Sequence, residues 1–108
     1  MPRLLDDDEV DARLKKLPGW KRDGRFITKT YEFEQFVDGI AFIGTVARVA
    51  EKQEHHPDIH LRYTEVTLSL QTHSSGGVTG WDFSLARAIE RAVGGSRMES
   101  SIRGTRIR

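Results

Sequence analysis

The feature that most restricts the fold is a change of side-chain alternation between Ile59 and Thr72. Apolar residues occupy odd positions in the first half of this stretch and even positions in the second half: Ile59, Leu61, Tyr63, Val66, Leu68 and Leu70. Successive side chains of a strand point to opposite faces of a sheet, so one straight strand cannot bury both sets. A two-residue turn at Thr64-Glu65 would pair Tyr63 with Val66 and place all six residues on one face. The stretch therefore predicts a hairpin, whose opposite face carries His60, Arg62, Thr67 and Ser69.

A second hairpin is predicted between Trp20 and Phe33, where apolar residues again recur at every second position. Asp23-Gly24 suits a tight two-residue turn, because such turns need residues that tolerate positive φ angles. This turn would pair Trp20 with Ile27 across the hairpin. The buried face would then hold Trp20, Ile27, Tyr31 and Phe33.

Two shorter helices are predicted near the ends of the chain from their capping residues. The first, Leu5–Leu17, begins with Asp6 as N-cap and Glu9 as its capping-box partner. The last begins after Thr79, which is the expected N-cap, with Asp82 at the N3 position. Its inward stripe is predicted to contain Trp81, Leu85, Ile89 and either Ala92 or Val93.

The longest predicted helix covers residues 36–52, where apolar residues recur at helical spacing. Pro57 disfavours helical backbone at the residue before it. The helix should therefore end near His55-His56 and leave both side chains at the end of the element.

The predicted order of elements is helix, hairpin, helix, hairpin, helix. This order indicates an α+β fold of two layers, a four-stranded antiparallel sheet with three helices packed on one face (order α-β-β-α-β-β-α). Residues 1–93 would form this single domain. Residues 94–108 are rich in Gly, Ser and Arg, which favours a flexible basic tail. An exposed edge strand of the sheet could pair with another subunit.

Composition excludes several functional classes. The chain has no cysteine, which rules out a disulfide framework, a thiolate nucleophile and a cysteine-bearing zinc site. The N-terminal residues lack the apolar core of a signal peptide, and no apolar run is long enough to cross a membrane, so we expect a cytoplasmic location. The net charge of +1 provides no basic face for nucleic acid, and the arginines of the tail are the sole candidate for such a contact.

Four histidines carry most of the chemical options of the chain: His55, His56, His60 and His73. A zinc site is disfavoured, because two adjacent imidazoles do not easily reach one metal ion and no HExxH pattern is present. The serines lack the GxSxG context of an activated nucleophile. The histidines could also be surface residues without a role. The favoured interpretation is metal-free general acid/base chemistry on a small molecule, with Glu51 and Glu54 placed to orient an imidazole.

Part of this pattern resembles the signature of the pterin-4a-carbinolamine dehydratase family. The residues and intervals are Glu51, three residues, His55-His56-Pro57, five residues, Tyr63, nine residues, His73, eight residues and Asp82. The likeness extends from about Leu14 to about Val93. Ser74 departs from those family members that have an acidic residue after the last histidine. The family fold, a four-stranded antiparallel sheet with three helices on one face, agrees with the predicted order of elements.

The resemblance implies a lyase that dehydrates 4a-hydroxytetrahydropterin to quinonoid dihydropterin, with no metal or cofactor, in tetrahydrobiopterin regeneration. Loss of the 4a hydroxyl requires an acid at the oxygen and a base at the N5 proton. By position, His55 and His73 would transfer protons and His56 would place the pterin. Glu51 and Glu54 would tune or orient the histidines.

The resemblance also implies contacts with the pterin outside the histidines. Pro57 would border the substrate, and its hydrogen-bonding edge would meet the peptide groups of Thr72, His73, Ser74 and Ser75. Asp82 would be either a member of the catalytic set or only a helix cap. Tyr63 is expected to pack in the core, and His60 to lie on the surface.

The resemblance leaves a second class of function open. Relatives include a dimerisation cofactor of a homeodomain transcription factor and proteins that act as assembly factors, so a protein-binding role is the alternative. Family members form dimers and tetramers, which implies a homodimer or homotetramer here. An aromatic amino acid hydroxylase would supply the substrate. Neither a membrane nor nucleic acid is an expected partner.

Overall fold

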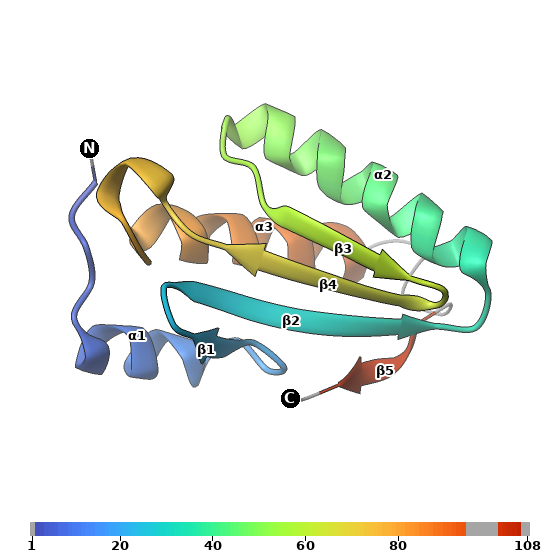
Figure 1. Ribbon diagram of the computed structural model, residues 1–108, viewed down its shortest axis with the longest axis horizontal. Helices are drawn as coiled ribbons and strands as arrows, with labels where there is room; N and C mark the ends of the chain where they lie inside the picture. Colours follow the sequence, from blue (N-terminus) through green and yellow to red (C-terminus); the bar gives the residue numbers. More distant parts are fainter. Residues whose placement is uncertain (1, 95–101, 107–108) are drawn as a thin grey trace.

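The computed structural model describes residues 2–94 and 102–106, and for the second range only the backbone. Figure 1 shows helices packed beside one sheet. The elements are α1 (Asp7–Leu14), β1 (Lys21–Asp23), β2 (Phe26–Phe33), α2 (Phe36–Gln53), β3 (Asp58–Arg62), β4 (Glu65–Leu70), the 3-10 turn η1 (His73–Ser75), α3 (Gly80–Gly94) and β5 (Ile102–Arg106). The predicted α+β class and the predicted order of helices and hairpins are confirmed.

The sheet has the order β1-β2-β4-β3, with antiparallel pairing throughout. The strand β5 also pairs with β2, along the part of β2 that lies beyond the β1 pairing. This fifth strand belongs to the segment that was expected to be flexible. Residues 95–101, 107 and 108 of that segment lie outside the described residues, so the expected flexibility of the tail as a whole stays a prediction.

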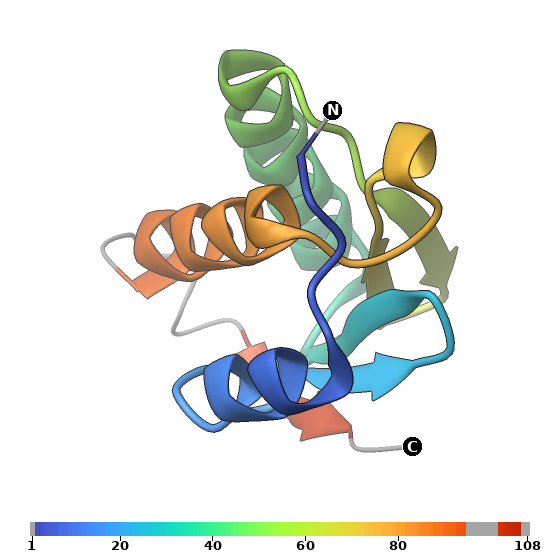
Figure 2. The ribbon, with the colours of Figure 1, turned by 90° about the vertical axis from the view of Figure 1, so that its left-hand side faces the viewer.

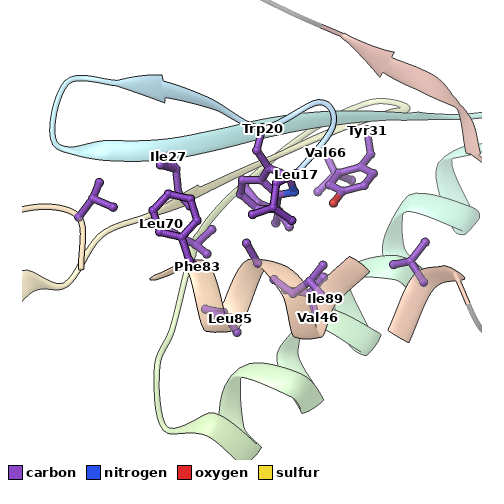
Figure 3. Close-up of a cluster of buried hydrophobic side chains, with 14 of the residues drawn as sticks. Leu17, Trp20, Ile27, Tyr31, Val46, Val66, Leu70, Phe83, Leu85 and Ile89 are labelled. Atoms are coloured by element: carbon purple, nitrogen blue, oxygen red, sulfur yellow. The ribbon is translucent and has the colours of Figure 1, made fainter. Parts of the chain in front are cut away.

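The core lies between the inner face of the sheet and the helices, on the side that Figure 2 shows occupied by α2 and α3. Side chains from β2 and β4 meet those of α2 and α3 in the close-up of Figure 3. Every residue predicted for the buried face of the first hairpin is buried: Trp20, Ile27, Tyr31 and Phe33. The apolar side chains of the second hairpin are also buried on β4. On β3 they are not, because Ile59 is exposed.

The positions of both hairpin turns differ from the prediction by one residue. The first loop is Gly24-Arg25, because Asp23 pairs with Phe26. Gly24 has a φ of +60°, and a glycine with positive φ at the first central position is typical of a type II′ turn. The second loop is residues 63–64, because Arg62 pairs with Glu65. Moving a loop by one residue shifts each cross-strand pair by two, which leaves the predicted faces unchanged.

The expectation that Tyr63 packs in the core is wrong. Tyr63 lies in the second hairpin turn with a φ of +50°. Its side chain is 76 % exposed, because the turn directs it away from the sheet. His60, on the outer face of β3, is exposed as predicted.

A polar cluster lies beside the core near the C-terminal end of α3, far along the helix from Asp82. The ammonium of Lys29 lies 3.0 Å from both carboxylate oxygens of Glu90 and 3.1 Å from the Pro18 carbonyl oxygen. The hydroxyl of Tyr31 donates to the same carboxylate, and the indole N–H of Trp20 lies 3.3 Å from it. Glu90 therefore compensates the buried ammonium and gives both buried aromatic donors a partner.

The N-terminal segment is attached to the loop that precedes α3. The capping box of α1 is present as predicted, with Asp6 accepting from the Glu9 amide at 2.9 Å. The helix itself is shorter than expected, because residues 4 and 5 are extended and Leu5 donates its amide to the Val78 carbonyl at 3.0 Å. This contact positions the start of α3 against the first residues of the chain.

Candidate active site

The predicted site residues come from three element ends that lie at one end of the molecule. The C-terminal end of α2, the loop that follows β4 and the N-terminal end of α3 occupy the left half of Figure 1. Helix α2 stops at Gln53 because Glu54 adopts a left-handed conformation, with a φ of +53°. The chain then turns, and His55 and His56 follow the helix instead of continuing it, as predicted.

Asp82 is the centre of the best-defined part of the site. Its carboxylate has no solvent-exposed area. One oxygen, Oδ1, lies 2.6 Å from Nε2 of His55. The other, Oδ2, accepts from the hydroxyl of Thr72 and from the amide of Thr79, both at 2.9 Å. Asp82 therefore caps α3 as predicted and also holds His55, so the two interpretations of this residue are compatible.

The contact with Asp82 determines which atom of His55 is available for chemistry. An ionised carboxylate only accepts hydrogen bonds, so Nε2 of His55 must carry a proton. In the neutral ring Nδ1 then has the lone pair, and no hydrogen bond to Nδ1 occurs within residues 2–94. The side chain is only 13 % exposed, which restricts its motion. The geometry therefore presents one imidazole nitrogen of fixed orientation.

His56 is more exposed than His55 and forms a separate pair. Its Nε2 forms a hydrogen bond with a carboxylate oxygen of Glu51, which lies in the last turn of α2. Both side chains are well exposed. Glu51 is thus placed to orient His56 as the sequence predicted, whereas the side chain of Glu54 forms no hydrogen bond or ion pair with a histidine within residues 2–94.

His73 begins the turn η1 and is exposed. Its Nδ1 lies 3.4 Å from the side-chain amide nitrogen of Gln71. An amide nitrogen can only donate, so Nδ1 of His73 accepts and a neutral ring carries its proton on Nε2. Gln71 was not identified from the sequence, and only its place two residues before His73 could have indicated it.

The backbone of the loop after β4 is largely used in internal hydrogen bonds. The amide of Thr72 donates to the Gly77 carbonyl at 2.8 Å, and the amide of Ser75 donates to the Thr72 carbonyl at 3.0 Å. The hydroxyl of Ser75 donates to the Pro2 carbonyl at 2.7 Å, which ties the loop to the N-terminal segment. The predicted contacts of the peptide groups of Thr72, His73, Ser74 and Ser75 with a substrate stay a prediction, as does the role of Pro57.

A cavity of about 450 Å³ adjoins His55 between α2 and α3. It is lined by Lys52, Gln53, Glu54, His55, Trp81 and Ser84. Trp81 was predicted to point inward from α3, and this is wrong, because the side chain is 52 % exposed. Asp82 and Phe83 take the inward positions in the first turn of the helix. The indole of Trp81 instead meets the imidazole of His55 edge to face, with ring centroids 6.0 Å apart.

Neither a metal cluster nor a membrane helix is found in the described residues. No group of three or more His, Asp or Glu side chains in residues 2–94 is arranged to hold a metal ion. No helix in the same part of the chain is long and apolar enough to span a bilayer.

Comparison with known proteins identifies relatives over most of the chain. The family described as pterin 4 alpha carbinolamine dehydratase matches residues 3–92. A protein of Roseiflexus castenholzii, provisionally named pterin-4-alpha-carbinolamine dehydratase, is 48 % identical over 93 residues, which are 86 % of this chain and 100 % of the relative. A protein of Mycobacteroides abscessus with the same provisional name is 44 % identical over 84 % of this chain and 97 % of its own length.

Two solved structures have a similar fold. The crystal structure of a transcriptional coactivator/pterin dehydratase from Brucella melitensis matches with a TM-score of 0.76 and 37 % identity, over 82 % of this chain and 96 % of that one. A pterin dehydratase-like protein identified as a RuBisCO assembly factor in the alpha-carboxysome matches with a TM-score of 0.60 over 72 % of this chain and 93 % of that one. The second pair is 21 % identical, so this likeness concerns the fold alone.

Proposed function

Because the chain belongs to the pterin 4 alpha carbinolamine dehydratase family, we propose that it converts 4a-hydroxytetrahydropterin to quinonoid dihydropterin and water. The observation that carries the proposal is the hydrogen bond between His55 and the buried carboxylate of Asp82. A histidine oriented by a carboxylate, with its second nitrogen free, is suited to general acid/base catalysis. The proposed pathway is tetrahydrobiopterin regeneration after an aromatic amino acid hydroxylase.

The reaction needs two proton transfers at neighbouring atoms of the pterin. A base removes the proton from N5, and the electron pair of that bond forms the N5–C4a double bond. The C4a–O bond breaks as an acid protonates the hydroxyl, which leaves as water. No electron acceptor or additional reactant is consumed, so histidine side chains are sufficient for the chemistry.

The surroundings of the two rings suit complementary roles for His55 and His73. Neutral His55, with Nε2–H donated to Asp82, offers a lone pair on Nδ1 and is suited to accept the N5 proton. His73 is exposed at the start of η1 and is proposed to protonate the hydroxyl as an imidazolium, which becomes a neutral ring when it gives up its proton. In each turnover His55 gains one proton and His73 loses one, and proton exchange with water restores both. His56, oriented by Glu51, is proposed to position the pterin.

Stopped-flow absorbance with chemically generated 4a-hydroxytetrahydropterin tests the proposal. The purified protein should raise the rate of dehydration in proportion to its concentration, above the spontaneous rate. Chelation of divalent metals should leave the rate unchanged, since the proposed chemistry uses only side chains. A rate equal to the spontaneous rate at micromolar protein would show that the chain is not a dehydratase.

A protein-binding role is the second candidate and rests on a different surface. Three apolar side chains at the start of α2 are exposed: Phe36, Val37 and Ile40. Exposed apolar residues that adjoin one another are typical of protein interaction sites. A stable complex with another protein, isolated from a chain that has no dehydratase activity, would favour this candidate over the enzyme.

A further inference from the structure

The side chain of Trp81 is placed where neither folding nor helix capping requires an aromatic ring. It lies in the first turn of α3, next to the buried Asp82, yet half of its surface is exposed. The core is complete without it, because Phe83 and Leu85 fill the inward positions of the same helix. The exposed indole therefore offers apolar surface that a ligand can cover.

The surroundings of Trp81 indicate what covers it. The indole forms one wall of the cavity of about 450 Å³ to which His55 also belongs. The indole and the imidazole of His55 are in contact edge to face, at an interplanar angle of 73°. The other contributors are polar: Lys52 and Gln53 at the end of α2, and Ser84 one turn after Trp81. A compact bicyclic ligand with an apolar face and polar edges matches such a cavity.

We propose that Trp81 contacts the bound pterin and contributes to the preference of this enzyme for bicyclic substrates of this shape. The proposal rests on the proposed function: if His55 binds the pterin, the pterin lies next to this cavity, because His55 lines it. The indole packs against the pterin ring system or its C6 substituent, and Lys52 and Ser84 border the polar edge of the same ligand. Trp81 is thus a specificity-determining contact and takes no part in proton transfer.

The contact predicts a particular kinetic pattern. Trp81→Ala should raise KM about three- to tenfold, the size expected for loss of one aromatic contact, while kcat changes less than twofold. Trp81→Phe should retain a KM near that of the unaltered enzyme, since a smaller aromatic ring preserves the contact. Tyr63→Ala is the matched control, because it removes an exposed aromatic ring at the opposite end of β3 from the histidines.

A binding measurement separates this proposal from the dehydratase assignment. Titration with 7,8-dihydrobiopterin, which lacks the 4a hydroxyl, should quench tryptophan fluorescence in the unaltered protein and in Tyr63→Ala. In Trp81→Phe the quenching should fall by more than half, because the remaining Trp20 is buried near Glu90 at the other end of α3.

Each outcome of these measurements decides between the two proposals. Unchanged KM and unchanged quenching in the Trp81 variants would overturn the contact even if the dehydratase is active. A loss of kcat with KM and quenching unaltered would also overturn it, since Trp81 would then act only through His55. If the unaltered protein shows no dehydratase activity, the proposed function fails, and the quenching titration alone decides whether Trp81 binds a pterin.

Discussion

Nε2 of His55 lies 2.6 Å from Oδ1 of Asp82, a carboxylate that has no contact with solvent. The two residues are 27 positions apart, and the contact joins the end of α2 to the beginning of α3. Because Asp82 also accepts from Thr72 and Thr79, its orientation is fixed by three donors from separate parts of the chain. The position of the His55 imidazole is therefore a property of the fold and does not depend on a bound ligand.

Asp82→Asn is expected to reduce kcat by about 100-fold or more, because acid/base groups contribute on that scale. The amide has one acceptor, and if that oxygen stays with Thr72 and Thr79, its NH2 group faces Nε2 of His55. The proton of the ring then moves to Nδ1, the atom proposed to accept the N5 proton. Loss of the negative charge at the start of α3 should also lower the free energy of unfolding by about 0.3–1 kcal/mol. Stopped-flow rates and thermal melts measure the two effects.

The matched control for this substitution is Asp38→Asn. Asp38 is a carboxylate in the first turn of α2, at the end of the helix that is remote from His55. Its rate should remain within twofold of the unaltered enzyme. If Asp82→Asn has full activity, the proposed orientation of His55 by Asp82 is not needed for turnover.

His73→Ala is expected to lower kcat by about 100-fold, since the proposed acid is removed. The side chain is exposed, so the free energy of unfolding should change by no more than about 0.5 kcal/mol. His60→Ala is the control, because His60 is an exposed histidine on the outer face of β3 and lies outside the site. Equal rates in the two variants would exclude His73 as a proton donor.

His55→Ala should have two effects where His73→Ala has one. It should reduce kcat by a similar factor, and it leaves the buried Asp82 carboxylate without one of its donors. An unsatisfied buried group of this kind lowers the free energy of unfolding by about 1–3 kcal/mol. Chemical denaturation of both variants would reveal the difference, and full activity of His55→Ala would refute its role as base.

We also expect the chain to self-associate through its exposed apolar surface. Val37 is 62 % exposed and adjoins two other exposed apolar residues on α2, and β3 has no second partner among the described strands. Light scattering should give a mass that is a multiple of 12.3 kDa at micromolar concentration. Val37→Lys should lower that mass if α2 forms the contact, whereas Ala12→Lys on the exposed side of α1 should not. A monomer mass for the unaltered chain would contradict self-association.

Side-chain periodicity predicted the three helices, the two hairpins and the buried face of the first hairpin, but it could not locate the turns. A loop moved by one residue keeps every apolar side chain on the same face, so the two alternatives have the same pattern. The actual positions depend on backbone conformation in the turns. Glycine at position 24 was a recognisable signal for this, whereas the left-handed conformation of Tyr63 was not, because few residues of its kind adopt it.

The site was predictable to the extent that it follows from local structure. The end of α2 near His55, the capping position of Asp82 and the placement of Glu51 beside His56 all follow from spacing along the chain. The bond between His55 and Asp82 was not predictable, because it depends on how α2 and α3 cross. The exposure of Trp81 was missed for the same reason, since helical spacing alone does not say which face meets the core.

Tyr31 makes the stability of the fold sensitive to high pH. Burial, followed by the charge of Glu90 and the hydrogen bond to it, raises the pKa of Tyr31 well above its usual value of 10.0. Because the pKa is higher in the folded state than in the unfolded state, the stabilisation is complete below pH 10 and is lost as the pH rises above it. The free energy of unfolding should fall by about 1.4 kcal/mol per pH unit in that range from this group.

Tyr31→Phe separates this effect from the other titrations of the protein. The variant should be less stable by about 1 kcal/mol at pH 8, because the hydrogen bond to Glu90 is lost. Above pH 10 the difference should shrink and then reverse, since phenylalanine has no proton to lose. Tyr63→Phe, which alters the exposed tyrosine of the second hairpin turn, should retain the pH dependence of the unaltered chain. Urea denaturation between pH 8 and pH 11 tests this, and parallel curves for Tyr31→Phe and the unaltered chain would show that Tyr31 ionises as readily when folded as when unfolded.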